Sequence, residues 1–177
     1  MTDERLRELE RRWKETGSAE DEAAFLLEQV RAGGRERVVS RILISNNAIA
    51  FEALPRLLDG TPPRVVFDER HECCWRFRFL APDGECELTG PFLTQAVGEI
   101  DGTEFYFRAS GQEWEFETEI GGGPFPTGDP REFRLRQASD QAAEMDLELA
   151  LGVLVTCVTR FLSHQRSDPE PGERVSG

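Results

Sequence analysis

Residues 147–162 read LELALGVLVTCVTRFL, and this stretch decides the fold because it is apolar on nearly every side. Its charged residues are Glu148 and Arg160, and the 11 residues between them carry no charge. A membrane-spanning helix needs about 20 apolar residues, so the stretch predicts a core helix and no membrane span. A helix without a polar face must be enclosed on most sides, so the rest of the chain has to surround it.

The residues before this helix predict an antiparallel sheet, because apolar and polar side chains alternate with a period of two from residue 64 onward. In the segment 72–80 the residues expected on the apolar face are Cys73, Trp75, Phe77 and Phe79. The clearest strand is 112–120. Its inward residues are Trp114, Phe116, Thr118 and Ile120, and its outward residues are Glu113, Glu115, Glu117 and Glu119.

Turn residues separate the predicted strands. Asp101-Gly102 is a two-residue hairpin signal between strands at 96–100 and 103–109. A Gly/Pro-rich loop at 121–130 leads into a short strand at 131–137, with Phe133 and Leu135 inward. The apolar helix should then begin at Ser139 or Asp140 and run to about Ser163, with acidic residues near its start and basic residues near its end, as the helix dipole favours.

The N-terminal residues predict a helical hairpin. In the first helix, 3–15, Leu6, Leu9 and Trp13 form one apolar stripe. Thr16-Gly17 ends this helix, and Ser18 with Asp21 resembles a capping box that opens a second one. The second helix carries its predicted apolar face on Ala23, Ala24, Leu27 and Val30, and it ends at Gly33-Gly34.

The fold class predicted from these patterns is α+β, with the sheet forming either a closed barrel or a curved open sheet around the C-terminal helix. The expected organisation is a helical hairpin (1–34), a connecting segment (35–63), an antiparallel β domain with the C-terminal helix (64–166) and a polar, disordered tail (167–177). Residues 38–60 leave helix and strand both open, because Val38, Val39, Ile42 and Leu43 suit either and Pro55 would kink a helix.

Two parts of the chain resemble known protein families. The string LERRWKETGSAEDEAAFL (residues 9–26) resembles a helical hairpin near the start of many bacterial proteins of unknown function, a likeness that covers about residues 5–33. A third helix usually follows that hairpin, and the resemblance implies no particular activity. Residues 64–165, above all MDLELAL (145–151), resemble the tubby/LURP-one-like fold, whose hydrophobic C-terminal helix threads a β-barrel.

A helix gripped by an open sheet is instead similar to helix-grip folds of the START type, which implies a cavity for apolar ligands.

The net charge of the chain disfavours two classes of binding partner, nucleic acids and anionic membranes. The 177 residues include 34 Asp and Glu against 21 Lys and Arg, which gives a net charge of −13. Nucleic-acid phosphates and anionic membrane surfaces would be repelled on average. The N-terminal sequence MTDERL lacks the apolar core of a signal peptide, so the expected location is the cytoplasm.

The residues that could carry chemistry do not form a recognisable site. His71, Cys73, Cys74 and Cys86 lack the separated ligand pairs of a zinc site, and adjacent cysteines on a strand point to opposite faces. The only histidines are His71 and His164, and no G-x-S-x-G motif is present. We therefore predict no metal, no cofactor and no enzymatic activity.

The predicted function is protein–protein interaction, as an adaptor or regulatory module. The residues expected to bind the partner are the hairpin stripe (Leu6, Leu9 and Trp13) and the outward glutamates (Glu113, Glu115, Glu117 and Glu119). The glutamates favour a basic partner unless arginines of neighbouring strands (Arg76, Arg78, Arg134 or Arg136) neutralise them. The alternative function is binding of a lipid or other apolar ligand between sheet and C-terminal helix. The sequence leaves open whether the protein forms a homo-oligomer.

Overall fold

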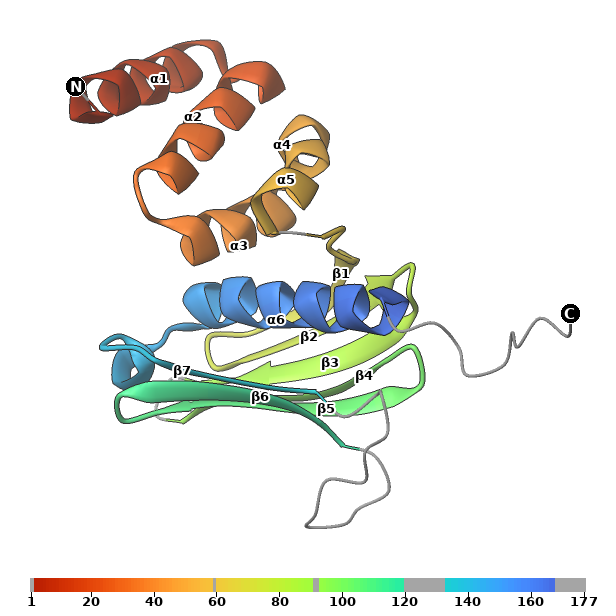
Figure 1. Cartoon of the computed structure of the whole chain (residues 1–177). Coiled ribbons are helices and arrows are strands. Elements are labelled where there is room, and N and C mark those ends of the chain that lie inside the picture. Colours follow the sequence, from red (N-terminus) through yellow and green to blue (C-terminus); the bar gives the residue numbers. More distant parts are fainter. Residues whose placement is uncertain (1, 59, 91–92, 120–132, 168–177) are drawn as a thin grey trace, which may run out of the picture.

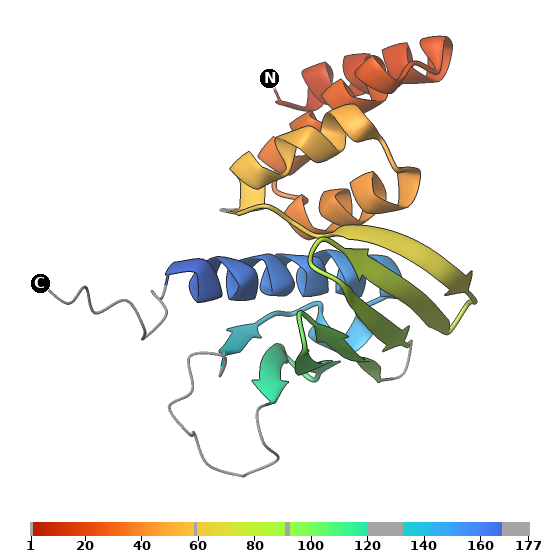
Figure 2. The same cartoon turned by 90° about the vertical axis from the view of Figure 1, so that its right-hand side faces the viewer.

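The apolar helix is α6 (Leu147–Ser167), and it lies between a layer of helices and a sheet in the computed structural model (Figure 1, Figure 2). The structure describes residues 2–58, 60–90, 93–119 and 133–167. The other helical elements are α1 (Thr2–Thr16), α2 (Ala19–Arg31), α3 (Arg35–Ser45), α4 (Ala48–Ala53), α5 (Pro55–Leu58) and the 3₁₀ turn η1 (Ala142–Glu144). The strands are β1 (Arg64–Arg70), β2 (Cys74–Leu80), β3 (Gly84–Thr89), β4 (Thr94–Ile100), β5 (Thr103–Ser110), β6 (Glu113–Glu119) and β7 (Arg134–Ala138). The predicted α+β class is confirmed.

The predicted hairpin is the pair α1 and α2. Gly17 adopts a φ of 62° between them, and the Ser18 side chain accepts a hydrogen bond from the backbone N–H of Asp21, so the predicted cap is confirmed. The predicted apolar face of α2 was only partly right. Ala23 is buried, but Phe25 and Leu26 are buried as well, while Ala24 and Leu27 are half-buried. The reason is that α2 packs against α1 on one side and against α3 and α4 on the other.

The described residues of the segment 38–60 fold as helices up to Leu58. Val38, Val39, Ile42 and Leu43 form the buried side of α3, which ends at Asn46 in the left-handed conformation. Asn47 caps α4 by accepting a hydrogen bond from the backbone N–H of Ala50. Pro55 begins α5, a position at which its missing N–H costs no helical hydrogen bond.

The sheet is an antiparallel meander in which each strand pairs with its neighbours in the sequence, in the order β1 to β7. Among the described residues β1 pairs only with β2 and β7 only with β6, so the sheet is open and the barrel alternative is not confirmed. The predicted loop 121–130 and the predicted tail beyond Ser167 lie outside the described residues. Ser167 itself ends α6 and so is not part of a tail.

The predicted alternation within the strands is confirmed for most of its residues. Phe77 and Phe79 in β2, and Trp114, Phe116 and Thr118 in β6, are buried on the α6 side. Cys73 was predicted to face inward and is exposed instead, because β2 begins only at Cys74 and a turn joins the backbone N–H of His71 to the carbonyl of Cys74. Ile120 lies outside the described residues.

The start of α6 differs from the prediction. The helix begins at Leu147, not at Ser139 or Asp140, and it reaches Ser167 instead of Ser163. Met145 is extended, with φ −67° and ψ 111°, and its carbonyl accepts a 2.6 Å hydrogen bond from the buried Thr94 hydroxyl, which holds the chain out of a helix there. Asp146 caps α6 by accepting a 2.8 Å hydrogen bond from the N–H of Leu149.

Both sides of α6 are covered, by α3 and by the aromatic face of the sheet (Figure 2). Its side chains with no exposed surface are Ala150, Leu151, Leu154, Val155, Val158, Thr159 and Phe161. Within the described ranges, α6 is the one helix whose length and composition would suffice to cross a membrane, a test that buried core helices also pass. Its apolar surface packs against the helical layer on one side and against the sheet on the other.

Gly152 brings α6 unusually close to α3. A Cβ added at this glycine would lie 2.5 Å from the carbonyl carbon of Glu36 and 3.0 Å from its Cα. Both are backbone atoms, so they cannot rotate away as a side chain would. We therefore expect the two helices to pack at this distance only with glycine at position 152.

Gly152→Ala should lower the free energy of unfolding by about 2–3 kcal/mol through overpacking, and the melting temperature by roughly 4–12 °C. Helix propensity alone predicts the opposite sign, because alanine favours a helix interior by about 1 kcal/mol over glycine. Gly34→Ala is the control, since its Cβ would meet its nearest neighbour at an ordinary 3.6 Å. Thermal unfolding followed by circular dichroism measures both, and an unchanged or raised melting temperature for Gly152→Ala would contradict the close packing.

Candidate functional site

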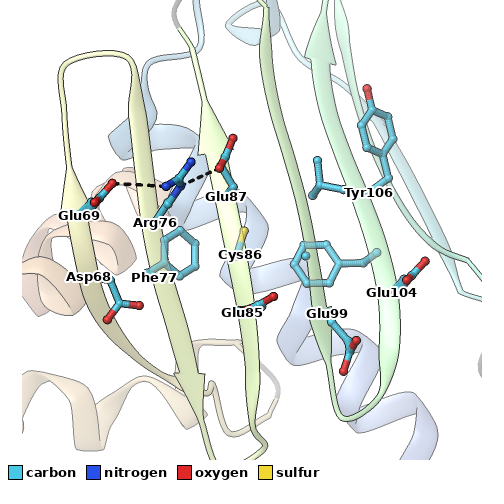
Figure 3. Close-up of a pocket in the computed structure, with 13 residues that line it drawn as sticks. Asp68, Glu69, Arg76, Phe77, Glu85, Cys86, Glu87, Glu99, Glu104 and Tyr106 are labelled. Carbon is cyan, nitrogen blue, oxygen red and sulfur yellow. Dashed lines mark hydrogen bonds and ion pairs between the residues drawn. The ribbon is translucent and has the colours of Figure 1, made fainter.

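A hollow of about 630 Å³ lies on the face of the sheet that points away from α6 (Figure 3). We call it the outer groove; its walls and floor come from β1 to β5. Alternation along the strands places its polar side chains, because residues next to a buried position point outward. The outward residues that line the groove include Arg76, Glu85, Glu87, Val97, Glu99, Glu104 and Tyr106.

One wall of the outer groove carries paired charges. A bulge in β1 shifts the register between Phe67 and Glu69, so Asp68 and Glu69 both meet arginines of β2 on the outer face. Asp68 accepts hydrogen bonds of 3.0–3.1 Å from Arg78. Arg76 donates a 2.7 Å hydrogen bond to Glu87 and lies 3.6 Å from Glu69, as the dashed lines of Figure 3 show. Arg76 and Arg78 of this wall are therefore already paired with carboxylates of the protein.

The middle of the outer groove carries glutamates that make no ion pair, although Arg78, which bonds Asp68, is the cross-strand partner of Glu85. Glu85, Glu99 and Glu104 are direct cross-strand partners on β3, β4 and β5. In the described part of the chain, none of the three makes an ion pair within 4.0 Å. Like charges placed directly opposite each other destabilise a sheet, by an amount of the order of 0.2–1 kcal/mol per pair. We call these three residues the glutamate row.

An apolar strip lies beside the glutamate row. Val97 and Tyr106 are cross-strand partners two residues further along β4 and β5. Val97 is 57% exposed, more than any other large apolar residue of the described core and surface, although it sits in a central strand. Tyr106 is half-buried, and its hydroxyl lies 3.3 Å from the side-chain oxygen of Gln95. The outer groove therefore combines negative charge with exposed apolar surface.

The glutamates of β6, which were predicted from the sequence to bind a partner, lie outside the outer groove. Arg136 bonds Glu113, and Arg134 bonds Glu115 and lies 3.8 Å from Glu117. Arg108 adds a 3.1 Å bond to Glu115. Glu115 is 6% exposed, so it does not face solvent as predicted, because three strands place arginine and glutamate side chains together over it. The side chain of Glu119 lies outside the described residues.

These ion pairs set the charge state of the β6 glutamates. The hydrogen bond from Arg136 lowers the pKa of Glu113. Burial acts to raise the pKa of Glu115, but the hydrogen bonds and positive charges of Arg134 and Arg108 lower it overall. The predicted neutralisation by Arg134 and Arg136 is therefore confirmed, whereas Arg76 and Arg78 bond carboxylates of β1 and β3 instead.

The predicted hairpin stripe is only half-buried, and Trp13 is used within the hairpin. Its ring stacks on Phe25 of α2, with 5.5 Å between the ring centroids. Leu6 and Leu9 are also half-buried. Arg12 of α1 lies 2.7 Å from the buried Asp21, so polar contacts fasten α1 to α2 as well. Helix α1 lies on the same side of the sheet as α6 (Figure 1), whereas the outer groove is on the opposite face, so the stripe is not near the groove.

No protein-family model, curated protein or solved structure matches this chain. The likenesses to the bacterial hairpin and to the tubby/LURP-one-like fold therefore stay predictions. The candidate site rests on the geometry of the sheet, in which the glutamate row and Val97 stand out from the paired charges around them.

The cysteines do not add a metal site to this geometry. Across the described ranges, no group of three or more His, Cys, Asp or Glu side chains is placed to hold a metal ion. Cys73 is exposed, Cys74 is half-buried and Cys86 is buried beneath the outer groove. Burial raises the pKa of the Cys86 thiol well above its usual value, so this side chain is a packed thiol and not a reactive thiolate.

The glutamate row was not predicted from the sequence, although the sequence contains the turn that places two of its three residues opposite each other. The Asp101-Gly102 turn pairs Ile100 with Thr103, and extending the hairpin by one residue on each strand places Glu99 opposite Glu104. Glu85 could not be added in that way. Its partner on β4 depends on the longer connection after Thr89, whose length does not dictate a register.

Proposed function

We propose that this protein is a non-enzymatic protein-interaction module, an adaptor or regulator, whose outer groove binds a basic segment of a partner protein. One observation carries the proposal: three adjacent glutamates face each other across β3, β4 and β5 and make no ion pair among the described residues, since Arg78, the cross-strand partner of Glu85, bonds Asp68 instead. Elsewhere on the same face, Arg76, Arg78, Arg108, Arg134 and Arg136 all pair with carboxylates. The glutamate row is the exception to this pairing.

Binding of lysine or arginine would turn this unfavourable arrangement into a favourable one. The side chains of a basic partner would supply the counter-charges that β2 and β7 supply elsewhere, and an apolar residue beside them would cover Val97. The net charge of −13 supports the same partner, because a negative protein attracts cationic segments and speeds their association.

The alternative, a binder of lipids or other apolar ligands between sheet and α6, has less support. The space between them holds Phe77, Phe79, Phe105, Phe107 and Phe116, each at most 2% exposed. These rings contact one another, for example Phe77 with Phe79 at 5.4 Å and Phe105 with Phe116 at 5.5 Å between centroids. An apolar ligand would have to displace packed aromatic side chains, so we favour the interaction module.

The test removes the charge of the glutamate row without changing its shape. The triple variant Glu85→Gln, Glu99→Gln, Glu104→Gln should bind a lysine-bearing peptide about tenfold more weakly than wild type, since three exposed ion pairs together contribute about 1.4 kcal/mol. Fluorescence anisotropy at physiological salt measures the affinity. The variant should melt at or above the wild-type temperature, because cross-strand repulsion is removed.

A matched control separates the outer groove from the charge of the whole protein. Glu20, Glu52 and Glu144 are exposed, lie outside the outer groove and make no ion pair in the described structure. Their triple replacement by glutamine changes the net charge by the same three units. Affinity should stay within about twofold of wild type in this control. An equal loss in both triple variants would refute the outer groove as the binding site.

A further inference from the structure

We propose that the partner segment is an α-helix that lies across β3, β4 and β5, with lysine or arginine three to four residues apart on the side facing the glutamate row. This inference rests on the proposed function and adds the conformation and orientation of the partner. It follows from the direction in which the three carboxylates are arranged and from the spacing between them.

The glutamate row runs across the strands. Glu85, Glu99 and Glu104 occupy paired positions on three neighbouring strands, so their separation is set by the distance between strands (Figure 3). Neighbouring strands lie about 4.8 Å apart, so the row spans about 9.6 Å from first to third backbone position. Any partner that uses all three carboxylates must repeat its cations at close to this spacing.

A helix matches this spacing better than an extended peptide does. Residues i, i+4 and i+7 share one side of a helix and span about 10.5 Å, because each residue rises 1.5 Å. Three same-face residues of an extended strand span about 13.4 Å. The mismatch is thus about 1 Å for the helix and about 4 Å for the strand, and flexible lysine and arginine side chains absorb the smaller one easily.

The surroundings of the glutamate row limit the basic stripe on one side. At the β2 side the direct partner of Glu85 is Arg78, whereas at the β6 side the direct partner of Glu104 is Glu119. A further lysine or arginine beyond Glu85 would meet the Arg78 guanidinium and be repelled. The basic stripe of the fitting helix therefore ends at Glu85, in contrast to a long polybasic tail, whose additional charges gain nothing on that side.

The apolar strip defines a second side of the same helix. Val97 and Tyr106 lie two residues along their strands from Glu99 and Glu104, a shift of about 6.7 Å. A helix with side chains is about 10–12 Å wide, so it covers both lines at once. The side next to the basic stripe should therefore carry leucine or a similar apolar residue over Val97, as an amphipathic helix does in a groove.

Three peptides of identical composition test the inference on the full-length protein. Each has about 18 residues, long enough to form helix in water, with three lysines and three leucines in an alanine- and glutamine-rich background. The first carries lysine at i, i+4 and i+7, the second at i, i+2 and i+4, and the third has its lysines spread around the helix. Fluorescence anisotropy gives the affinities, and far-ultraviolet circular dichroism gives the helix content.

The first peptide should bind at least about tenfold more tightly than the other two and gain helix on binding, since only it places all three lysines on the glutamate row. Glu99→Gln, in the middle of the row, should remove most of that preference. Equal binding of the three peptides to wild type, weakened equally by the triple glutamine variant, would overturn the helix inference and leave the proposed function standing. Binding of all three that is insensitive to the triple variant would overturn both.

Discussion

Leu154→Asp should abolish folding, and Leu151→Asp should do the same. Both leucines have no exposed surface and sit in the middle of α6, with α3 on one side and the sheet on the other. A carboxylate there would have to be buried without a partner or protonated, at a cost of several kcal/mol, in addition to the lost apolar contacts. Since whole domains are stable by only about 5–15 kcal/mol, we expect insoluble or unfolded protein.

The control for this experiment is Leu154→Met. Methionine nearly conserves volume and should cost less than about 1.5 kcal/mol, so it keeps the core filled while changing the same residue. Soluble expression, circular dichroism and thermal melting distinguish the variants. A Leu154→Asp protein that stayed soluble and melted at the wild-type temperature would refute the enclosed position of α6.

Deleting residues 2–34 should unfold the protein or lower its melting temperature by well over 10 °C, whereas deleting residues 2–17 should cost only a few degrees. The two helices of the hairpin differ in what they contact. Helix α2 supplies Ala23 and Leu26 to the main core, and the Asn47 side chain donates hydrogen bonds of 2.9 Å to the Ala19 carbonyl and 2.7 Å to Glu22. Helix α1 packs chiefly on α2.

The shorter deletion removes the stacking of Trp13 on Phe25 and two ion pairs, from Arg12 to Asp21 and from Arg5 to Glu28. Such contacts contribute about 1–2 kcal/mol together, or roughly 2–8 °C for a chain of this size. Thermal melting of both truncated proteins, with Trp13→Ala in the full chain for comparison, gives the answer. Similar melting temperatures for the two deletions would show that α2 contributes no more than α1.

The elements that could be predicted from the sequence are those fixed by neighbouring residues. The Ser18 cap, the hairpin at Asp101-Gly102 and the alternation of β6 all depend on contacts within a few positions of the chain. The helix character of residues 38–58 could not be predicted in this way. The apolar residues of α3 suit helix or strand equally, and their packing on α6, more than a hundred residues later, decides between the two.

The same difference between local and long-range contacts explains which features of the candidate site could be predicted. The β6 glutamates are conspicuous along the chain, but their arginine partners come from β7 and β5, and only the sheet brings them together. The glutamate row is inconspicuous, because Glu85, Glu99 and Glu104 are scattered among other acidic residues. Its meaning depends on strand register, which places three like charges side by side, while Arg78, the cross-strand partner of Glu85, bonds Asp68 instead.

The position of α6 in the chain has a consequence for biosynthesis. The aromatic face of the sheet and the buried side of α3 are both translated before the helix that covers them. Until residues 147–162 have emerged from the ribosome, each nascent chain therefore presents two large apolar surfaces with no cover. Chaperone binding should accordingly be strongest for nascent chains that end between β7 and the middle of α6, and messages truncated there should yield aggregates.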